Sequence, residues 1–463
     1  MANVSNETIE KLASQMRGEV ITPSDSQYDN ARAIWNAMID RRPAVIVRCK
    51  GVADITRSIS FAREQNLLLA IRGGAHNIAG NAICDDGLVV DLSRMNSVHV
   101  NPETRRAYVE SGATLYDFDH EAQIFGLATP LGINSTTGVA GLTLGGGFGW
   151  LTRKYGLTID NLVSAEIITA EGKRIVASEQ NNPDLFWGIR GGGGNFGVVT
   201  QFEFQMHAVG PNVLCGLLVF PLSEGKTVLN QYRKFVDNMP DELSVWAVLR
   251  KAPPLPFLPA DVHGKEVVVL AVCYAGDIET GKQLIEPLRG FGKLHGQHIG
   301  PNPYAAWQQT FDPLLAPGAR NYWKSHNFTS LSDALIDTVL DYAGKLPSPL
   351  CEIFMGLLGG QASRISPDAT AYTHRDAKFV MNVHTRWETP EDDAKCIDWA
   401  RDFFKVSTPY ATGGVYVNFL TEDESDRLKA AYGNNYDRLV ELKKKYDPEN
   451  LFRMNQNIAP SKG

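Results

Sequence analysis

Two glycine-rich segments of this chain could bind a phosphate-bearing ligand and hold an imidazole beside it. The first, residues 71–80, has the sequence IRGGAHNIAG. Gly73 and Gly74 permit close approaches that a β-carbon would block, and successive N–H groups in such a turn form a nest for an anion. Arg72 adds positive charge, and His76 follows at once, so its imidazole would contact the same ligand. A structural turn with a hydrogen-bonded core histidine is the alternative that this loop alone leaves open.

The second segment, residues 138–149, has the sequence GVAGLTLGGGFG. Its glycines leave one side of the backbone almost free of side chains, which favours a ligand cradle, although a tight turn under a helix would also use them. A third cluster contains a formal GxGxxG at Gly192, Gly194 and Gly197. Glycines of that spacing bind a dinucleotide when they open a helix, whereas residues 198–204 (VVTQFEF) have the composition of a strand. We therefore do not expect a Rossmann site here.

The segments before the first glycine loop have the layout of a nucleotide-binding fold. Residues 44–49 (AVIVRC) and 67–71 are short apolar runs, and residues 53–65 between them carry apolar side chains at helical spacing. This order predicts a strand, a helix, a second strand and then the glycine loop. A helix is also predicted over residues 28–40.

The character of the sequence changes near residue 209. Beyond it, predicted strands and helices alternate, which indicates an antiparallel sheet covered on one face by helices. The strands are expected at residues 213–220, 267–274, 351–358, 378–387 and 415–420, and the helices at 225–238, 280–288, 331–345 and 391–404. A charged helix is expected over 422–445. Residues 451–460 mix apolar and amide side chains and are expected to pack back on the first domain.

Composition excludes several classes of function. The net charge of −7 argues against binding to nucleic acid, because no basic stripe is present to displace counterions. The polar N-terminus lacks the apolar core of a signal peptide, and no run is long enough to span a bilayer. The six cysteines are scattered without a CxxC, which predicts a reduced, cytoplasmic protein. No metal site is expected, since the HxxH at His295 and His298 has no acidic ligand nearby.

Taken in order, these motifs resemble the berberine-bridge-enzyme-like branch of the vanillyl-alcohol-oxidase (PCMH-type) flavoprotein family. The resemblance covers nearly the whole chain, and within the branch it is closest to the bacterial 6-hydroxynicotine-oxidase-like members. It is carried by the RGGxH loop, VDLSRMN at 90–96, SGAT at 111–114, the glycine cradle followed by RKYGL at 153–157, NFGVVT at 195–200 and YDPENLF at 446–452.

The resemblance implies an α+β fold of three parts. An FAD-binding domain of the PCMH type, itself built in two parts, would span residues 1–207. A substrate domain with a helix-covered antiparallel sheet would span 208–420, and a C-terminal segment, 421–463, would return to the FAD-binding domain.

The implied cofactor is FAD, bonded through its 8α-methyl group to His76. Many family members carry a second link through a cysteine, but Asn134 stands at the matching position, which implies a single histidyl bond. Ala75 replaces a usual glycine, and Val139 falls where the family tunes oxygen access. The residues expected to hold FAD are Arg72, Gly73, Gly74, Ala75, His76, Asn77, Gly80, Leu92, Ser93, Asn134, Thr137, Gly138, Val139, Gly141, Gly146, Gly147, Gly149, Val199, Asn455 and Asn457.

The family places its catalytic polar groups on a sheet that faces the flavin. In the predicted strand 378–387, alternation puts Asn382 and His384 on one face. In the segment YVNF, Tyr416 begins a pattern that resembles Tyr-x-Asn-Tyr with its last tyrosine lost. Tyr416 and His384 are the candidates for a base, with Asn382 beside them, although either could simply be packed in the sheet. The substrate pocket is expected to be lined by the alternating residues Tyr322, Lys324 and His326.

The resemblance implies an FAD-dependent oxidase that dehydrogenates a C–OH or C–N bond of a small organic substrate. Hydride would pass to flavin N5, and molecular oxygen would reoxidise the flavin to give hydrogen peroxide. A dehydrogenase with another acceptor, and a flavin-binding protein that has lost its catalytic residues, remain alternatives. The expected partners are a small molecule and oxygen, with no nucleic acid and no membrane; a homo-oligomer is left open.

Overall fold

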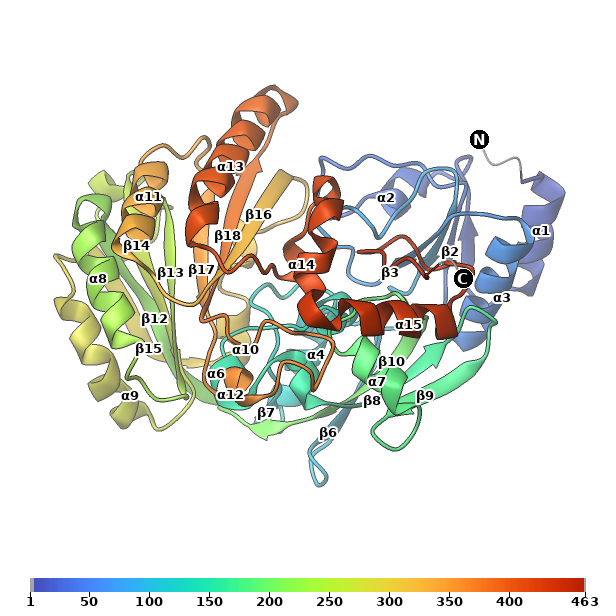
Figure 1. Ribbon diagram of the computed structural model, residues 1–463, viewed down its shortest axis with the longest axis horizontal. Helices are drawn as coiled ribbons and strands as arrows, with labels where there is room; N and C mark the ends of the chain where they lie inside the picture. Colours follow the sequence, from blue (N-terminus) through green and yellow to red (C-terminus); the bar gives the residue numbers. More distant parts are fainter. Residues whose placement is uncertain (1–3, 462–463) are drawn as a thin grey trace.

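A computed structural model describes residues 4–461 of the chain (Figure 1). The four-stranded sheet nearest the N-terminus has the order β1-β2-β4-β3, in which β1 is antiparallel to β2 and the other pairs are parallel. Its strands are β1 (Glu19–Ile21), β2 (Val45–Arg48), β3 (Leu69–Arg72) and β4 (Leu88–Asp91), and its helices are α1 (Asn6–Gln15), α2 (Tyr28–Arg32) and α3 (Val52–Glu64). The first glycine loop begins where β3 ends, as the strand–helix–strand pattern predicts. The helix predicted over residues 28–40 ends at Arg32.

A second sheet is entirely antiparallel and has the order β5-β6-β10-β8-β9. Its strands are β5 (Val98–Asn101), β6 (Arg106–Glu110), β8 (Leu162–Ile168), β9 (Arg174–Ser178) and β10 (Val198–Gln205). The other elements of this region are α4 (Leu115–Gln123), α5 (Val139–Leu144), α6 (Thr152–Tyr155), η1 (Thr158–Asn161), α7 (Pro183–Ile189) and the small ladder of β7 (Leu127–Ala128) with β11 (His207–Ala208). Because β10 and not a helix follows Gly197, the third glycine cluster lacks the Rossmann geometry.

The third sheet has seven antiparallel strands in the order β15-β12-β14-β13-β17-β18-β16. They are β12 (Asn212–Pro221), β13 (Leu243–Lys251), β14 (Glu266–Tyr274), β15 (Gly296–Pro303), β16 (Arg320–Phe328), β17 (Glu352–Leu357) and β18 (Phe379–Trp387). Helices α8 (Gly225–Phe235), α9 (Ile278–Ile285), α11 (Asp333–Ala343) and α13 (Asp393–Ser407) cover its outer face (Figure 1). The predicted α+β class, with a helix-covered antiparallel sheet, is confirmed; β13, β15 and β16 are not among the predicted strands.

Shorter helices connect these elements. They are η2 (Leu222–Glu224), η3 (Ala260–Val262), η4 (Glu286–Gly290), α10 (Tyr304–Gln308), η5 (Asp312–Leu314), α12 (Gln361–Arg364), η6 (Pro390–Asp392) and η7 (Thr408–Tyr410). Among residues 4–461, no helix combines the length and the apolar composition that crossing a membrane requires.

Two predicted elements near the C-terminus are wrong. Residues 415–420 were expected to form a strand, but they pair with no neighbour and instead contain the 3-10 helix η8 (Val417–Phe419). The single helix expected over 422–445 is divided into η9 (Glu422–Arg427), α14 (Leu428–Tyr432), η10 (Gly433–Asn435) and α15 (Tyr436–Tyr446). The break falls at Gly433, whose φ of +48° lies in the left-handed region that a helix interior cannot use.

A buried lysine fixes the C-terminal segment, which is red in Figure 1, to the first half of the chain. Lys443 and Asp447 are completely buried, and the Lys443 Nζ lies 2.7 Å from a carboxylate oxygen of Asp447. The same ammonium donates to the carbonyl oxygens of Asn195 and Phe452, each at 2.8 Å. The Asn195 side chain in turn accepts a hydrogen bond from the Ile458 N–H at 2.9 Å. These contacts fix residues 452–458 beside the loop that precedes β10.

Replacing Lys443 with methionine is expected to lower the free energy of unfolding by about 3–5 kcal/mol, because it leaves the buried Asp447 carboxylate without its cation. Urea denaturation followed by circular dichroism measures this loss. Lys445→Ala is the matched control. Lys445 lies on the same helix as Lys443, but its ion pair with Asp184 of α7 is exposed and should contribute at most about 1 kcal/mol. Equal losses in the two variants would contradict the role assigned to Lys443.

Candidate active site

A cavity of about 350 Å³ lies where the glycine segments meet the inner face of the seven-stranded sheet. Its walls come from the first glycine loop, the second glycine segment, the loop before β10, the sheet and the C-terminal segment. The predicted FAD-binding residues that line it are Gly73, Gly74, Ala75, His76, Asn77, Leu92, Asn134, Thr137, Gly138, Gly141, Val199 and Asn455. Residues from all parts of the chain therefore meet at one place.

The glycines of these walls are of two kinds. A β-carbon on Gly74 would lie 2.3 Å from the backbone nitrogen of Gly138, so the two glycine segments touch through bare backbone. A β-carbon on Gly141 or Gly194 would instead meet nothing within 4 Å, so these positions present open backbone to the cavity that they line. Ala75 has a φ of +57°, a conformation that favours glycine. The bare walls suit a flat ligand that approaches the backbone closely.

The His76 imidazole is held with one nitrogen engaged. Thr136 Oγ1 lies 2.9 Å from His76 Nε2 and donates its own proton to Asn134 Oδ1 at 2.8 Å, so Nε2–H is the donor to Thr136. This arrangement leaves Nδ1 as the nitrogen with a free lone pair. Trp35 stacks on the imidazole with a ring separation of 5.1 Å. Burial, together with the charge of Arg386, lowers the pKa of His76 to about 4, which keeps the imidazole neutral at pH 7.

Eight of the residues predicted to hold FAD do not line the cavity: Arg72, Gly80, Ser93, Val139, Gly146, Gly147, Gly149 and Asn457. The Arg72 guanidinium, expected to add charge to the phosphate site, donates instead to the carbonyl oxygens of Ala31 and Ala33. It therefore braces the end of α2. Gly147 lies behind the cavity wall and donates its N–H to the hydroxyl of Tyr416 at 3.1 Å.

The polar groups of the sheet face centre on His384. Its Nδ1 lies 3.2 Å from Glu352 Oε1, and its Nε2 has no hydrogen-bond partner among the described residues. Burial alone would raise the pKa of Glu352, but the charges of Arg250 and Arg386 and the hydrogen bond from His384 outweigh it and lower that pKa to about 2. Burial lowers the pKa of His384 below its usual 6.5. At neutral pH the site therefore contains an ionised Glu352 carboxylate that is hydrogen-bonded to the neutral imidazole of His384.

Tyr416 and Asn382 lie on the same cavity wall. The Tyr416 oxygen accepts hydrogen bonds from the Gly147 N–H and from Asn418 Nδ2 at 2.9 Å. Burial nevertheless raises the pKa of Tyr416 to about 12, so the phenol keeps its proton at neutral pH. Asn382 Oδ1 is buried without a partner among the described residues. The wall thus offers a phenolic proton, a free amide oxygen and a basic imidazole nitrogen.

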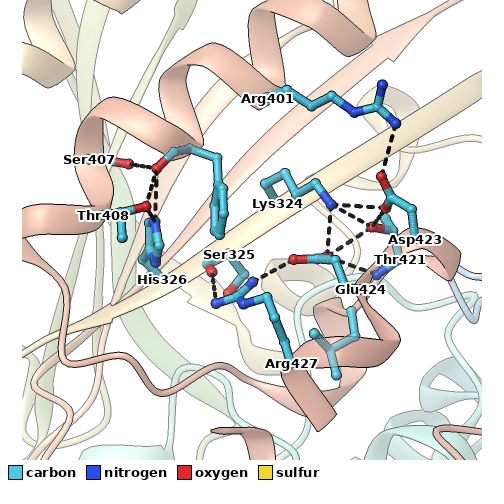
Figure 2. Close-up of polar contacts among 12 residues, drawn as sticks. Lys324, Ser325, His326, Arg401, Ser407, Thr408, Thr421, Asp423, Glu424 and Arg427 are labelled. Carbon is cyan, nitrogen blue, oxygen red and sulfur yellow. Dashed lines mark hydrogen bonds and ion pairs between the residues drawn. The ribbon is translucent and has the colours of Figure 1, made fainter.

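Tyr322, Lys324 and His326 do not line the cavity, which corrects their expected position in the substrate pocket. Figure 2 shows Lys324 directed toward Asp423 and His326 beside Thr408. Trp323 faces the cavity, and because side chains alternate along a strand, its neighbours point to the opposite face of β16. There the Tyr322 hydroxyl donates to Asp423 at 2.6 Å, and the Lys324 ammonium lies 2.9 Å from Asp423. His326 Nε2 lies 3.1 Å from the carbonyl oxygen of Phe404 in α13. These three residues bind the sheet to α13 and η9.

Several residues that line the cavity were not predicted from the sequence. Glu352 is a lone carboxylate in the apolar run CEIFMGLL, a signal that could have marked it as a site residue. Its partner Arg250 lies on β13, a strand that was not predicted. The missed residues on the sheet side are mainly aromatic: Trp35, Trp246, Trp323, Phe354 and Phe419.

The chain is similar to known families and proteins along nearly its whole length. Residues 43–178 match the FAD binding domain family, and residues 415–459 match the berberine and berberine-like family. An FAD-linked oxidoreductase of Dictyostelium discoideum is 32% identical over 98% of each chain. The (R)-6-hydroxynicotine oxidase of Paenarthrobacter nicotinovorans is 31% identical over 97% of this chain and 99% of its own. The crystal structure of 6-hydroxy-D-nicotine oxidase from Arthrobacter nicotinovorans superposes with a TM-score of 0.86 at 30% identity, covering 96% of this chain and 98% of that one.

Proposed function

The chain belongs to the berberine-bridge-enzyme-like family of FAD-linked oxidoreductases, and we propose that it is an oxidase that dehydrogenates a C–OH or C–N bond of a small organic molecule. Overall, the substrate loses two hydrogens and becomes a carbonyl or an imine, while oxygen gains them and becomes hydrogen peroxide. FAD held by the residues of the cavity would supply the two-electron acceptor for this oxidation, with oxygen as the final acceptor.

The chain's own residues fit this cofactor. The open backbone at Gly141 and Gly194 leaves room for a flat ring system against the cavity wall, and the Asn455 side chain has an oxygen without a partner among the described residues. The residues that would hold FAD are those predicted residues that line the cavity. Gly147, bonded to Tyr416, and Lys443, bonded to Asn195, stabilise the segments behind them.

We propose that His76 carries FAD covalently, through a bond from Nδ1 to the 8α-methyl carbon. The support is that Nε2 is engaged by Thr136, that Nδ1 has no hydrogen-bond partner among the described residues, and that burial keeps the imidazole neutral. Forming this bond releases two electrons and two protons, which oxygen takes up as hydrogen peroxide. No cysteine lines the cavity among residues 4–461, and Asn134 stands beside His76, so a single covalent bond is proposed.

The proposed base is His384. Its side chain lines the cavity, and its neutral imidazole has Nδ1 hydrogen-bonded to Glu352 and a buried Nε2 without a partner among the described residues. This is the observation that most directly supports the proposal. Nε2 would accept the proton of the substrate hydroxyl or amine while hydride leaves the adjacent carbon. Tyr416 keeps its proton at neutral pH, so its role is to donate a hydrogen bond to the substrate, and Asn382 Oδ1 offers an acceptor.

An aerobic screen of secondary alcohols, cyclic amines and sugars, with hydrogen peroxide as the readout, tests the activity. An oxidase gives peroxide with at least one class, and its substrate-reduced flavin is reoxidised rapidly in air. Bleaching by a substrate without rapid reoxidation would favour the dehydrogenase alternative. Normal photoreduction with no substrate able to bleach the flavin would favour a flavin-binding protein without activity.

Tyr416→Phe is expected to lower kcat/KM only about 3- to 10-fold, because the hydrogen bond to the substrate that it removes joins neutral groups. The hydrogen bonds that the Tyr416 oxygen accepts from Gly147 and Asn418 are also lost, which should lower the free energy of unfolding rather than the rate. The ring packing is kept, and the pH profile should keep its shape because His384 is intact. Steady-state peroxide assays across pH measure both properties. A loss of a thousandfold or more would instead make Tyr416 the base.

A further inference from the structure

Four residues lie directly opposite one another on neighbouring strands and form a row across the sheet. Arg250 on β13 pairs in register with Glu352 on β17, Glu352 pairs with His384 on β18, and His384 pairs with Trp323 on β16. Because neighbouring strands lie only about 4.8 Å apart, each side chain in this row can contact the next.

The contacts along the row occupy both oxygens of Glu352. Arg250 Nη1 lies 2.7 Å from Oε2, and His384 Nδ1 lies 3.2 Å from Oε1. Since the carboxylate is ionised, it can only accept, so His384 must carry its proton on Nδ1. The imidazole and the Trp323 ring pack edge to face, with the ring centroids 4.7 Å apart and the planes at 78°.

We propose that Glu352 is a positioning residue for the reaction: it fixes His384 in the tautomer whose Nε2 can accept a proton and stabilises the imidazolium that results. Arg250 holds the carboxylate in the orientation that this requires. The proposal rests on the proposed function, because it takes His384 as the base. The step is a simple proton transfer, in which the substrate O–H or N–H proton goes to Nε2 and the Nδ1 proton stays on the imidazolium, bonded to Glu352.

Two alternative roles for Glu352 make different predictions. Glu352 could itself act as the base, but Arg250 and His384 engage both of its oxygens and keep its affinity for protons low. Glu352 could also be only a structural ion-pair partner of Arg250. In that case the protonation pattern of His384 would not depend on it.

Glu352→Gln tests the proposal because it keeps the shape of the side chain and removes its charge. The amide can donate to Nδ1, which moves the imidazole proton to Nε2 and removes the free lone pair. Nitrogen-15 NMR of histidine-labelled protein, with the His384 signals assigned by their loss in His384→Asn, should show the Nδ1–H tautomer in the wild type. We expect the Nε2–H tautomer in the variant, and a fall in kcat on the order of 10²- to 10⁴-fold.

Asp393→Asn is the matched control, since it breaks an arginine–carboxylate pair with Arg320 on the same sheet. That pair lies away from the cavity, so the tautomer and kcat should not change. Glu352→Asp, which restores the charge, should regain the Nδ1–H tautomer and part of kcat. An unchanged tautomer in Glu352→Gln, or a kcat within threefold of the wild type, would overturn the proposal. If no substrate is ever found, the oxidase proposal fails, while the tautomer still decides whether Glu352 orients His384.

Discussion

Precipitated His76→Ala protein is expected to be colourless, whereas denatured, precipitated wild-type protein stays yellow. The reason is that a covalent bond survives unfolding, while a flavin held only by the cavity walls is released when those walls unfold. Among residues 4–461, His76 is the side chain to which we assign this bond, because its imidazole is neutral and its Nε2 is engaged by Thr136.

The measurement is the visible spectrum of the washed precipitate and of the supernatant. His120→Ala is the control, because His120 is exposed and lies outside the cavity; its precipitate should be as yellow as that of the wild type. A colourless wild-type precipitate would reject the covalent assignment, and a yellow His76→Ala precipitate would move the bond to another residue.

His384→Asn is expected to lower the rate of substrate oxidation by about 10²- to 10⁴-fold, the usual contribution of a positioned general base. The flavin content should be unchanged, since His384 lies on the sheet wall and not in the glycine loops. Anaerobic mixing with substrate, with flavin bleaching as the readout, isolates this step from the reaction with oxygen.

The pH dependence gives a second signature of this base. A base must be unprotonated, and burial lowers the pKa of His384 below 6.5 despite the neighbouring Glu352. The wild-type kcat/KM should therefore be constant above pH 6.5 and should fall in more acidic solution, as Nε2 takes up a proton. The residual rate of His384→Asn should lack this fall.

Tyr322→Phe provides the control on the other face of the sheet. Its hydroxyl contacts Asp423 and Arg401, away from the cavity, so its kcat/KM should stay within about twofold of the wild type. A His384→Asn variant no slower than Tyr322→Phe would show that the proton leaves by another route.

Local patterns were sufficient to predict the position of the glycine loop and of His76. A strand followed by consecutive glycines predicts a tight loop, because few other residues permit the backbone conformations that such a loop needs. The same holds for β18, where period-two alternation correctly grouped Asn382 with His384, and both line the cavity.

Alternation predicts two faces of a strand but not which face meets the cavity. For β16 the polar residues Tyr322, Lys324 and His326 were expected there, yet the apolar Trp323 lies at the cavity. The reason is that the Lys324 ammonium is paired with Asp423 and Glu424 of η9, a distant part of the chain. Arg320, at the start of the strand, is paired with Asp393 of α13. Such pairing is decided by tertiary contacts that a single strand does not contain.

The row from Arg250 to Trp323 depends on the register of four strands. Register between strands is non-local, and shifting one strand by a single residue would turn Glu352 away from His384. Because β13 was not predicted, neither its pairing nor the role of Arg250 could be anticipated. The strand predicted over 415–420 is wrong for a related reason. The apolar composition of this segment suits a strand, but no partner strand lies beside it.

If one nitrogen of His76 is bonded to the flavin, peptide mass spectrometry will detect the bond. Trypsin should release residues 73–94, the peptide that contains His76, because Arg72 and Arg94 flank it. This peptide should carry the added mass of FAD less two hydrogens, and fragmentation should locate the addition on His76. A peptide with only the mass of its amino acids would show that no covalent bond to His76 exists.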